Sequence, residues 1–272
     1  MLDFKLYPQS AGEDLGMPES LKKCSSLVFF AGRHTRRLSV FLLSLLLLLL
    51  AGLAACTEPG EHDVRDANGN SLQELPQARV DGDVSLESAI AQRRSIRAYT
   101  GAAMPVQHLA QLFWAMQGIT SEGQGLRTTP SAGATYPLET LAVVGNVEEL
   151  DAGVYRYHPQ QHAISKIADG DQRAAVSAAA LNQNWMDQAA VIFIVTAVPE
   201  RTTAQYGERG EAFVKLEAGH AAQNLHLQAQ ALGYGSTPVG AFDDNDLMKA
   251  AGLSGEENPL YLLPVGEPEQ GI

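Results

Sequence analysis

The amino-acid sequence predicts an α+β fold in which helices and a sheet pack in layers, and three observations lead to this prediction. Strand-like and helix-like segments are mixed along residues 85–272 without the regular strand–helix–strand alternation of a Rossmann fold. Residues 189–198 are almost entirely apolar and rich in β-branched side chains, which predicts a central strand buried on both faces. Residues 211–232 carry apolar side chains and alanines in a helical pattern that Gly233 ends, which predicts one long helix.

Local signals place the other helices. A short helix is expected over residues 85–94, with Ser85 as its N-cap. Pro105 suits the first turn of a second helix, whose apolar residues recur at helical spacing until Gly118. Two further helices are expected over 171–181, which is rich in alanine, and over 244–251.

Short apolar runs predict the other strands. The runs 154–157 and 163–167 flank a polar turn and predict a hairpin. Short extended segments are expected over 141–144, 238–242 and 260–265.

Residues 1–55 are predicted to be an export signal. Three arginines between residues 33 and 37 precede a leucine-rich run from 39 to 55, which ends in small residues. The sequence Leu-Ala-Ala-Cys that ends at Cys56 resembles the lipobox of bacterial lipoproteins, in which the cysteine is lipidated. This resemblance implies a protein anchored at the bacterial cell envelope, facing the periplasm or the exterior. A plain transmembrane anchor and a cytoplasmic enzyme with a misassigned start are the alternatives, and the pattern does not decide between Sec and twin-arginine export.

The mature chain is expected to begin with a flexible tether over residues 56–84, because this stretch has several Gly and Pro residues and few large apolar ones. The folded domain would then occupy residues 85–272. The formal net charge of −12 argues against a nucleic-acid partner, which would require clustered basic residues. Two cysteines exclude a disulfide framework, and no metal-binding motif is present, so no metal site is expected.

Three segments have the composition of ligand-binding loops. Residues 93–97 (RRSIR) place three guanidinium groups around a hydroxyl at a helix end, a combination that suits phosphate. The alternative is a basic cluster that balances the helix dipole. Residues 129–134 (TPSAGA) and 237–242 (TPVGAF) are mostly small, so their backbone could approach a flat ligand closely. Taken separately, each is also typical of an ordinary loop or strand edge.

Five motifs in this order resemble the FMN-dependent nitroreductase superfamily: RRSIRAY, PSAGATYP, EAGHAAQNL, PVGAFD and LYLLPVG. The SagB-type dehydrogenases look like the nearest branch. The resemblance covers about residues 85–268. It implies a three-layer α-β-α sandwich, an intertwined homodimer and FMN bound noncovalently at the dimer interface.

The resemblance also assigns roles to individual residues. FMN phosphate and ribityl contacts fall on Arg93, Arg94, Ser95 and Arg97. The loop that reaches the flavin from the second subunit matches Pro130, Ser131, Ala132 and Gly133. The loop whose backbone N–H groups face flavin N5 matches Pro238, Val239, Gly240 and Ala241, and Gln183 matches an amide near the flavin pyrimidine.

Two departures from the family pattern stand out. Glu267 and Glu269 follow the last motif, where a basic residue commonly grips the phosphate. Azoline oxidases of the SagB-type branch carry a Lys-Tyr pair before the long helix, whereas this chain has Gln205 before Tyr206. Glutamine cannot accept a proton, which puts azoline oxidation in doubt. Tyr206 could donate a hydrogen bond or proton to a substrate, or it could be an aromatic packing residue.

Three polar residues of the long helix, Glu217, His220 and Asn224, share one face at spacings of three and four. We expect them to form a buried, mutually satisfied polar cluster and not a catalytic site.

The function that these expectations support is an FMN-dependent oxidoreductase that transfers hydride through flavin N5. Its partners would be a small-molecule substrate and an electron donor, either NAD(P)H or another reductant, since nicotinamide nucleotides are scarce outside the cytoplasm. The alternative is a lipid-anchored binding or scaffold module with a vestigial flavin site.

Overall fold

The computed structural model describes residues 64–121, 123–253, 255 and 257–269. The chain divides into a unit of residues 1–61 and a compact unit of residues 62–272, and every element described below belongs to the second. The predicted export signal, Cys56 and the first part of the predicted tether lie outside the described residues.

A seven-stranded sheet forms the middle of the domain, in the order β1-β6-β5-β4-β7-β9-β8. All pairings between its neighbouring strands are antiparallel. The strands are β1 (Leu72–Glu74), β4 (Leu138–Val144), β5 (Gly153–His158), β6 (Ala163–Asp169), β7 (Val191–Ala197), β8 (Gly235–Ser236) and β9 (Asn258–Gly266). Every residue of β7 is buried between β4 and β9, which confirms the predicted central strand.

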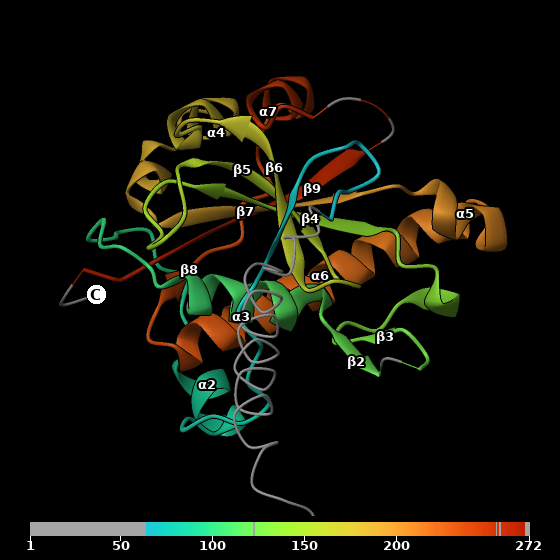
Figure 1. Ribbon diagram of the computed structural model, residues 1–272, viewed down its shortest axis with the longest axis horizontal. Coiled ribbons are helices and arrows are strands. Elements are labelled where there is room, and N and C mark those ends of the chain that lie inside the picture. Colours follow the sequence, from blue (N-terminus) through green and yellow to red (C-terminus); the bar gives the residue numbers. More distant parts are fainter. Residues whose placement is uncertain (1–63, 122, 254, 256, 270–272) are drawn as a thin grey trace, which may run out of the picture. The chain divides into compact units, whose positions relative to one another are not determined.

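Helices cover both faces of this sheet (Figure 1). On one face, α3 (Val106–Gln117) and α6 (Arg209–Ala231) enclose a core that includes Phe113, Phe193 and Leu225. On the other face, α4 (Arg173–Ala179) and α7 (Asp244–Ala250) pack over a second core. The prediction of an α+β three-layer α-β-α sandwich is therefore confirmed.

Local chemistry explains where the helices begin. The Ser85 hydroxyl accepts a hydrogen bond from the Ser88 N–H at the start of α2 (Leu86–Gln92), as predicted. Pro105 and Gly118 bound α3, and the Asp243 carboxylate accepts from the Asp246 N–H at the start of α7.

Several short elements were not predicted. Strands β2 (Ile119–Ser121) and β3 (Leu126–Arg127) form a small hairpin directly after α3. Helix α5 (Glu200–Tyr206) precedes α6, and a 3₁₀ turn (Asn184–Gln188) precedes β7. These pieces are too short and too polar to show a hydrophobic period.

The stretch predicted as a tether differs from the structure over its second half. Strand β1 pairs with β6, and the Leu75 side chain is buried in the core beside it. Further along, the side-chain amide of Gln111 accepts from the Arg79 N–H and donates to the Arg79 carbonyl oxygen. One buried leucine and backbone pairing therefore hold a segment whose composition resembles that of a linker.

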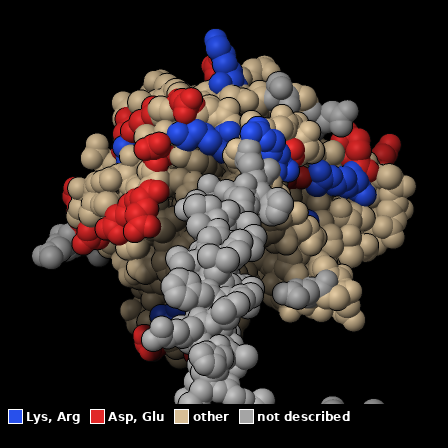
Figure 2. All heavy atoms as spheres, in the orientation of Figure 1, with Lys and Arg blue, Asp and Glu red and all other residues tan. Residues whose placement is uncertain are grey.

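Surface charges of both signs lie next to one another on the face shown in Figure 2. The ion pairs Arg156–Glu257 and Arg201–Glu139 both have N–O distances of 2.7 Å. Among the described residues, no helix has the length and apolarity needed to cross a bilayer.

Candidate functional site

The arginine-rich segment lies beside β8. The Ile96 N–H donates to the Ser236 carbonyl oxygen at 3.1 Å, and the Thr237 hydroxyl donates to the Ile96 carbonyl oxygen at 2.5 Å. Ser95 and Ser236 also form a parallel bridge. These contacts join two motifs that lie about 140 residues apart in sequence.

The three arginines of this segment differ in their contacts. The Arg94 guanidinium donates to the carbonyl oxygens of Ala91 and Arg93, at 2.9 and 2.8 Å, so it caps the end of α2. The Arg97 guanidinium carbon lies 5.9 Å from the centre of the Trp185 ring. Within the part of the chain that the structure describes, the guanidinium groups of Arg93 and Arg97 donate no hydrogen bond. The capping alternative thus describes Arg94, while Arg93 and Arg97 are available to an anion.

The 238–241 segment continues from β8 next to this cluster. The Val239 N–H donates to the Leu262 carbonyl oxygen at 2.8 Å, and proline has no N–H, so Pro238 and Val239 have no N–H left to offer. Gly240 and Ala241 are exposed, and their N–H groups donate to no described residue. Gln183 lies beside them, because its amide donates to the carbonyl oxygens of Ala180 and, at 3.4 Å, Ala241.

We call this assembly the arginine group; its members are Arg93, Arg94, Ser95, Arg97, Gln183, Pro238, Val239, Gly240 and Ala241. Behind it, the buried His226 imidazole on α6 shares a 2.7 Å hydrogen bond with the Ser236 hydroxyl. Burial first, and the nearby Arg93 charge second, lower the pKa of His226 to about 4. The imidazole is therefore neutral near pH 7.

The second set of predicted residues lies around the loop of residues 130–136. Gly133, Ala134 and Tyr136 have φ angles of 58°, 54° and 46°, in the left-handed region that only glycine enters without strain. The Thr135 and Thr202 hydroxyls share a 2.8 Å hydrogen bond, and Arg201 donates to the Tyr136 carbonyl oxygen. The loop is thus held in a strained conformation by α5.

Tyr206, the predicted catalytic residue, approaches the same loop. A Cβ atom added at Gly133 would lie 2.6 Å from the Tyr206 hydroxyl and 2.7 Å from the Gln205 amide oxygen, so a larger residue would have to displace these two side chains. The Tyr206 ring is half-buried and packs edge-on against Phe213 at 5.2 Å. No described residue forms a hydrogen bond with its hydroxyl, so both the packing role and the donor role agree with its position. We call Pro130, Ser131, Ala132, Gly133 and Tyr206 the loop group.

The expected polar cluster of α6 is wrong in this chain. Glu217 is buried, His220 is exposed, and Asn224 donates to the Thr129 hydroxyl at 3.2 Å. The Oε1 atom of Glu217 has no hydrogen-bond partner among the described residues. The three side chains do not satisfy one another, because Asn224 bonds to the 128–129 segment and His220 is exposed to solvent.

The two groups lie toward opposite ends of α6. The loop group contacts α5 and, through Tyr206, Phe213 near the start of this 23-residue helix, whereas the arginine group contacts His226 and β8 near its end. A helix of this length spans about 34 Å. Figure 1 shows α5 at one end of α6, with α2 and β8 at the other. One chain therefore does not bring all the predicted site residues together.

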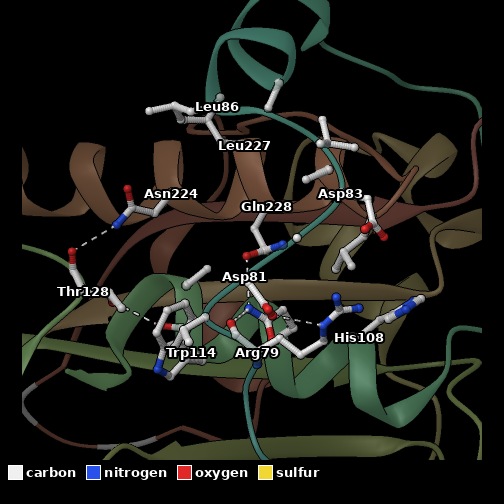
Figure 3. Close-up of a pocket in the computed structure, with 18 of the residues that line it drawn as sticks. Arg79, Asp81, Asp83, Leu86, His108, Trp114, Thr128, Asn224, Leu227 and Gln228 are labelled. Carbon is white, nitrogen blue, oxygen red and sulfur yellow. Dashed lines mark hydrogen bonds and ion pairs between the residues drawn. The ribbon is translucent and has the colours of Figure 1, made fainter.

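A cleft of about 580 Å³ opens between the segment Arg79–Val84, α3 and the second half of α6. Figure 3 shows Trp114 and His108 of α3 on one side, with Asn224 and Gln228 of α6 opposite. Sequence reasoning missed this cleft because segments distant in sequence form it. No group of His, Cys, Asp and Glu among the described residues could hold a metal ion.

Comparisons with known proteins agree with this architecture. The family model described as "Nitroreductase family" matches residues 90–267. A protein of Methanocaldococcus jannaschii named as a nitroreductase is 41% identical over 184 residues, which cover 68% of this chain and 91% of that protein. The trifolitoxin-processing protein TfxB of Rhizobium leguminosarum bv. trifolii is 32% identical over 117 residues, which cover 41% of this chain and only 31% of that protein.

Solved structures show the same fold. A structure from Ralstonia eutropha JMP134, described as a nitroreductase, has a TM-score of 0.65 at 23% identity, covering 73% of this chain and 90% of its own. One from Anabaena variabilis ATCC 29413 has a TM-score of 0.67 at 26% identity, covering 79% of this chain and 45% of its own. The family model spans more than half of the chain, and the Methanocaldococcus jannaschii relative is 41% identical over 91% of its own length. The chain therefore belongs to the nitroreductase family.

Proposed function

We propose that the protein is an FMN-dependent oxidoreductase of the SagB-type dehydrogenase kind. The observation that supports this most is the arginine group, in which the guanidinium groups of Arg93 and Arg97 and the N–H groups of Gly240 and Ala241 donate no hydrogen bond to any residue that the structure describes. Guanidinium groups bind phosphate through paired hydrogen bonds, so Arg93 and Arg97 would hold the FMN phosphate. FMN, when bound, supplies hydride transfer through N5.

The chain's own residues would position that cofactor. The N–H groups of Gly240 and Ala241 would face the flavin edge at N5, and Gln183 would lie near the pyrimidine. Backbone donors fixed in place stabilise negative charge on a reduced ring without reorganisation. The neutral His226 behind Ser236 adds no positive charge to this side of the site. The Tyr206 hydroxyl would donate a hydrogen bond or proton to the substrate.

A homodimer would complete the site. The loop group and the arginine group lie toward opposite ends of α6, so an antiparallel pairing of two copies would bring the loop of one copy to the arginines of the other. The Leu216 side chain on α6 is 58% exposed, which suits a surface that a second copy covers.

The assignment to the SagB-type branch rests on the match to one relative. The similarity to a trifolitoxin-processing protein favours a SagB-type enzyme, although the chain covers about a third of that relative. Gln205 stands where azoline oxidases have a lysine, so we propose oxidation or reduction of another small molecule. The electron donor would be NAD(P)H or, at the cell envelope, a different reductant.

The test is an absorbance spectrum of the purified protein after incubation with FMN and desalting. Flavin bands at about one FMN per chain are expected, and they should disappear in Arg93→Ala/Arg97→Ala. The control variant Lys166→Ala/Lys249→Ala removes two positive charges from other parts of the surface and should keep the flavin. Full occupancy in the arginine variant would contradict the phosphate site. A colourless, folded wild type would favour the binding or scaffold alternative.

We also propose that the chain is a lipoprotein exported to the cell envelope, on the strength of the sequence that ends at Cys56. Cell fractionation of the wild type and of Cys56→Ser tests this. The wild type should be found with membranes and the variant should be released from them. A variant that stays with the membranes would contradict lipid anchoring.

A further inference from the structure

The Trp185 side chain contacts both the arginine group and the second core of the domain. It belongs to the 3₁₀ turn Asn184–Gln188, and it is partly buried against the core that α4 and α7 cover. The next residue, Met186, is fully buried in that core and anchors the turn. The chain has two tryptophans, and the other one, Trp114, lines the cleft on α3.

Two residues of the arginine-rich motif approach the Trp185 ring. The Arg97 guanidinium carbon lies 5.9 Å from the ring centre, and the Tyr99 ring centre lies 6.3 Å from it at an interplanar angle of 35°. Tyr99 is itself fixed, because it is 2% exposed and its hydroxyl donates to the Ile96 carbonyl oxygen at 2.8 Å. A buried tyrosine therefore supports the ring that the guanidinium group approaches.

The contact with this ring leaves the N–H groups of Arg97 available. Among the described residues, no carboxylate forms an ion pair with Arg97 and none of its N–H groups donates a hydrogen bond. A cation over an aromatic face is attracted by the ring without using its N–H groups. A carboxylate in the place of Trp185 would occupy those N–H groups and compete with a phosphate for them.

The same turn also reaches the other half of the arginine group. Gln183, directly before the turn, donates to the Ala241 carbonyl oxygen at 3.4 Å. Inside the turn, the Asp187 carboxylate accepts a hydrogen bond from the Ser177 hydroxyl on α4. One anchored turn thus contacts both the arginine-rich segment and the 238–241 segment.

We propose that Trp185 is a positioning residue that holds the Arg97 guanidinium group for the phosphate of FMN, and so sets the preference of the site for FMN over riboflavin, which has no phosphate. The inference rests on the proposed function in taking Arg97 as a phosphate ligand. Arg97 is exposed, so without the ring its long side chain would be ordered only when FMN binds. Ordering such a side chain on binding lowers affinity, and holding it beforehand reduces that loss.

Titration of the flavin-free, full-length protein with FMN and with riboflavin, followed by flavin fluorescence, tests the inference without relying on activity. Trp185→Leu should raise the FMN dissociation constant about two- to fivefold, as expected for one cation–π contact at an exposed site, and should leave that of riboflavin unchanged. Trp185→Phe keeps an aromatic face and should recover part of the loss. The control Trp114→Leu removes the other tryptophan and should change neither constant.

A double substitution separates positioning from a general structural effect. In an Arg97→Ala background, Trp185→Leu should no longer change the FMN dissociation constant, because the group that it positions is gone. An equal loss of FMN and riboflavin affinity in Trp185→Leu, or an effect on FMN that persists without Arg97, would overturn the inference. Where Trp185→Leu does not fold, Trp185→Phe should still shift the ratio of the two constants, and an unchanged ratio would overturn it.

The outcomes also separate the inference from the proposed function. If the wild type binds FMN and Trp185→Leu keeps the same preference for FMN over riboflavin, only the role of Trp185 fails. If the wild type binds neither flavin, the proposed function fails, and the role of Trp185 fails with it.

Discussion

Two buried titratable groups of α6 should change the stability of the protein in opposite directions as pH changes. Burial raises the pKa of Glu217 from 4.5 to about 7. The folded protein then holds this proton more tightly than the unfolded chain, so its contribution is full below pH 4.5 and is lost as pH rises through 7. The pKa of His226 is lowered from 6.5 to about 4, so its contribution is full above pH 6.5 and is lost as pH falls through 4.

The two contributions are of similar size. Each pKa difference corresponds to about 3 kcal/mol, since a tenfold change in proton affinity is about 1.4 kcal/mol. Their ranges overlap between pH 4.5 and 6.5, where one contribution rises while the other falls. The wild type should therefore show little pH dependence from this pair in that range.

Single substitutions should reveal the two slopes. Glu217→Gln leaves His226, so the free energy of unfolding relative to the wild type should rise by about 3 kcal/mol from pH 4.5 to pH 7.5. His226→Asn should gain a similar amount relative to the wild type as pH falls from 6.5 to 4. The double variant should again show little slope. Urea unfolding of the flavin-free protein at several pH values measures this, and packing losses that do not depend on pH cancel out of the slopes. Slopes of the same sign in both single variants would refute the reasoning.

Three further predictions concern the backbone around the site. A Cβ at Gly235 would lie 2.7 Å from Ile96 Cβ, so Gly235→Ala should lower the free energy of unfolding by about 1–3 kcal/mol and lower FMN retention. The control Gly219→Ala adds a methyl group in open space on α6 and should raise Tm slightly. Equal thermal melting of these two variants would contradict the close packing of the arginine segment on β8. Gly133→Ala should lower Tm by several degrees, and less so in a Tyr206→Phe background, because its Cβ meets the Tyr206 hydroxyl. Ser85→Ala should cost about 1 kcal/mol through the lost cap of α2, measured by urea unfolding, and an unchanged midpoint would show that the cap contributes nothing.

Local chemistry made much of this fold predictable from the sequence. Ser85 and Gly118 mark helix ends, and the apolar run around β7 marks a strand buried on both faces. Strand β1 was not predictable in this way, because it is three residues long and a single buried neighbour, Leu75, anchors it. The site was also predictable only in part. Residue composition identified the segment around Arg93, but the pairing of this segment with Ser236 joins residues about 140 positions apart in sequence.

The position of His220 gives the proposed homodimer a sharp test. In a two-fold symmetric pairing along α6, residues at the axis contact their own copies, and an axis that exchanges the two ends of the helix must cross near its middle. His220 is at the middle of Arg209–Ala231, and its side chain is exposed. In a Cys24→Ser/Cys56→Ser background, His220→Cys should therefore form a disulfide between two chains under mild oxidation, while a cysteine at exposed Glu211 should not. A dimer in solution whose chains cross-link through position 211 and not 220 would show that the copies pair off-centre, and the loop of one copy would then not reach the arginines of the other.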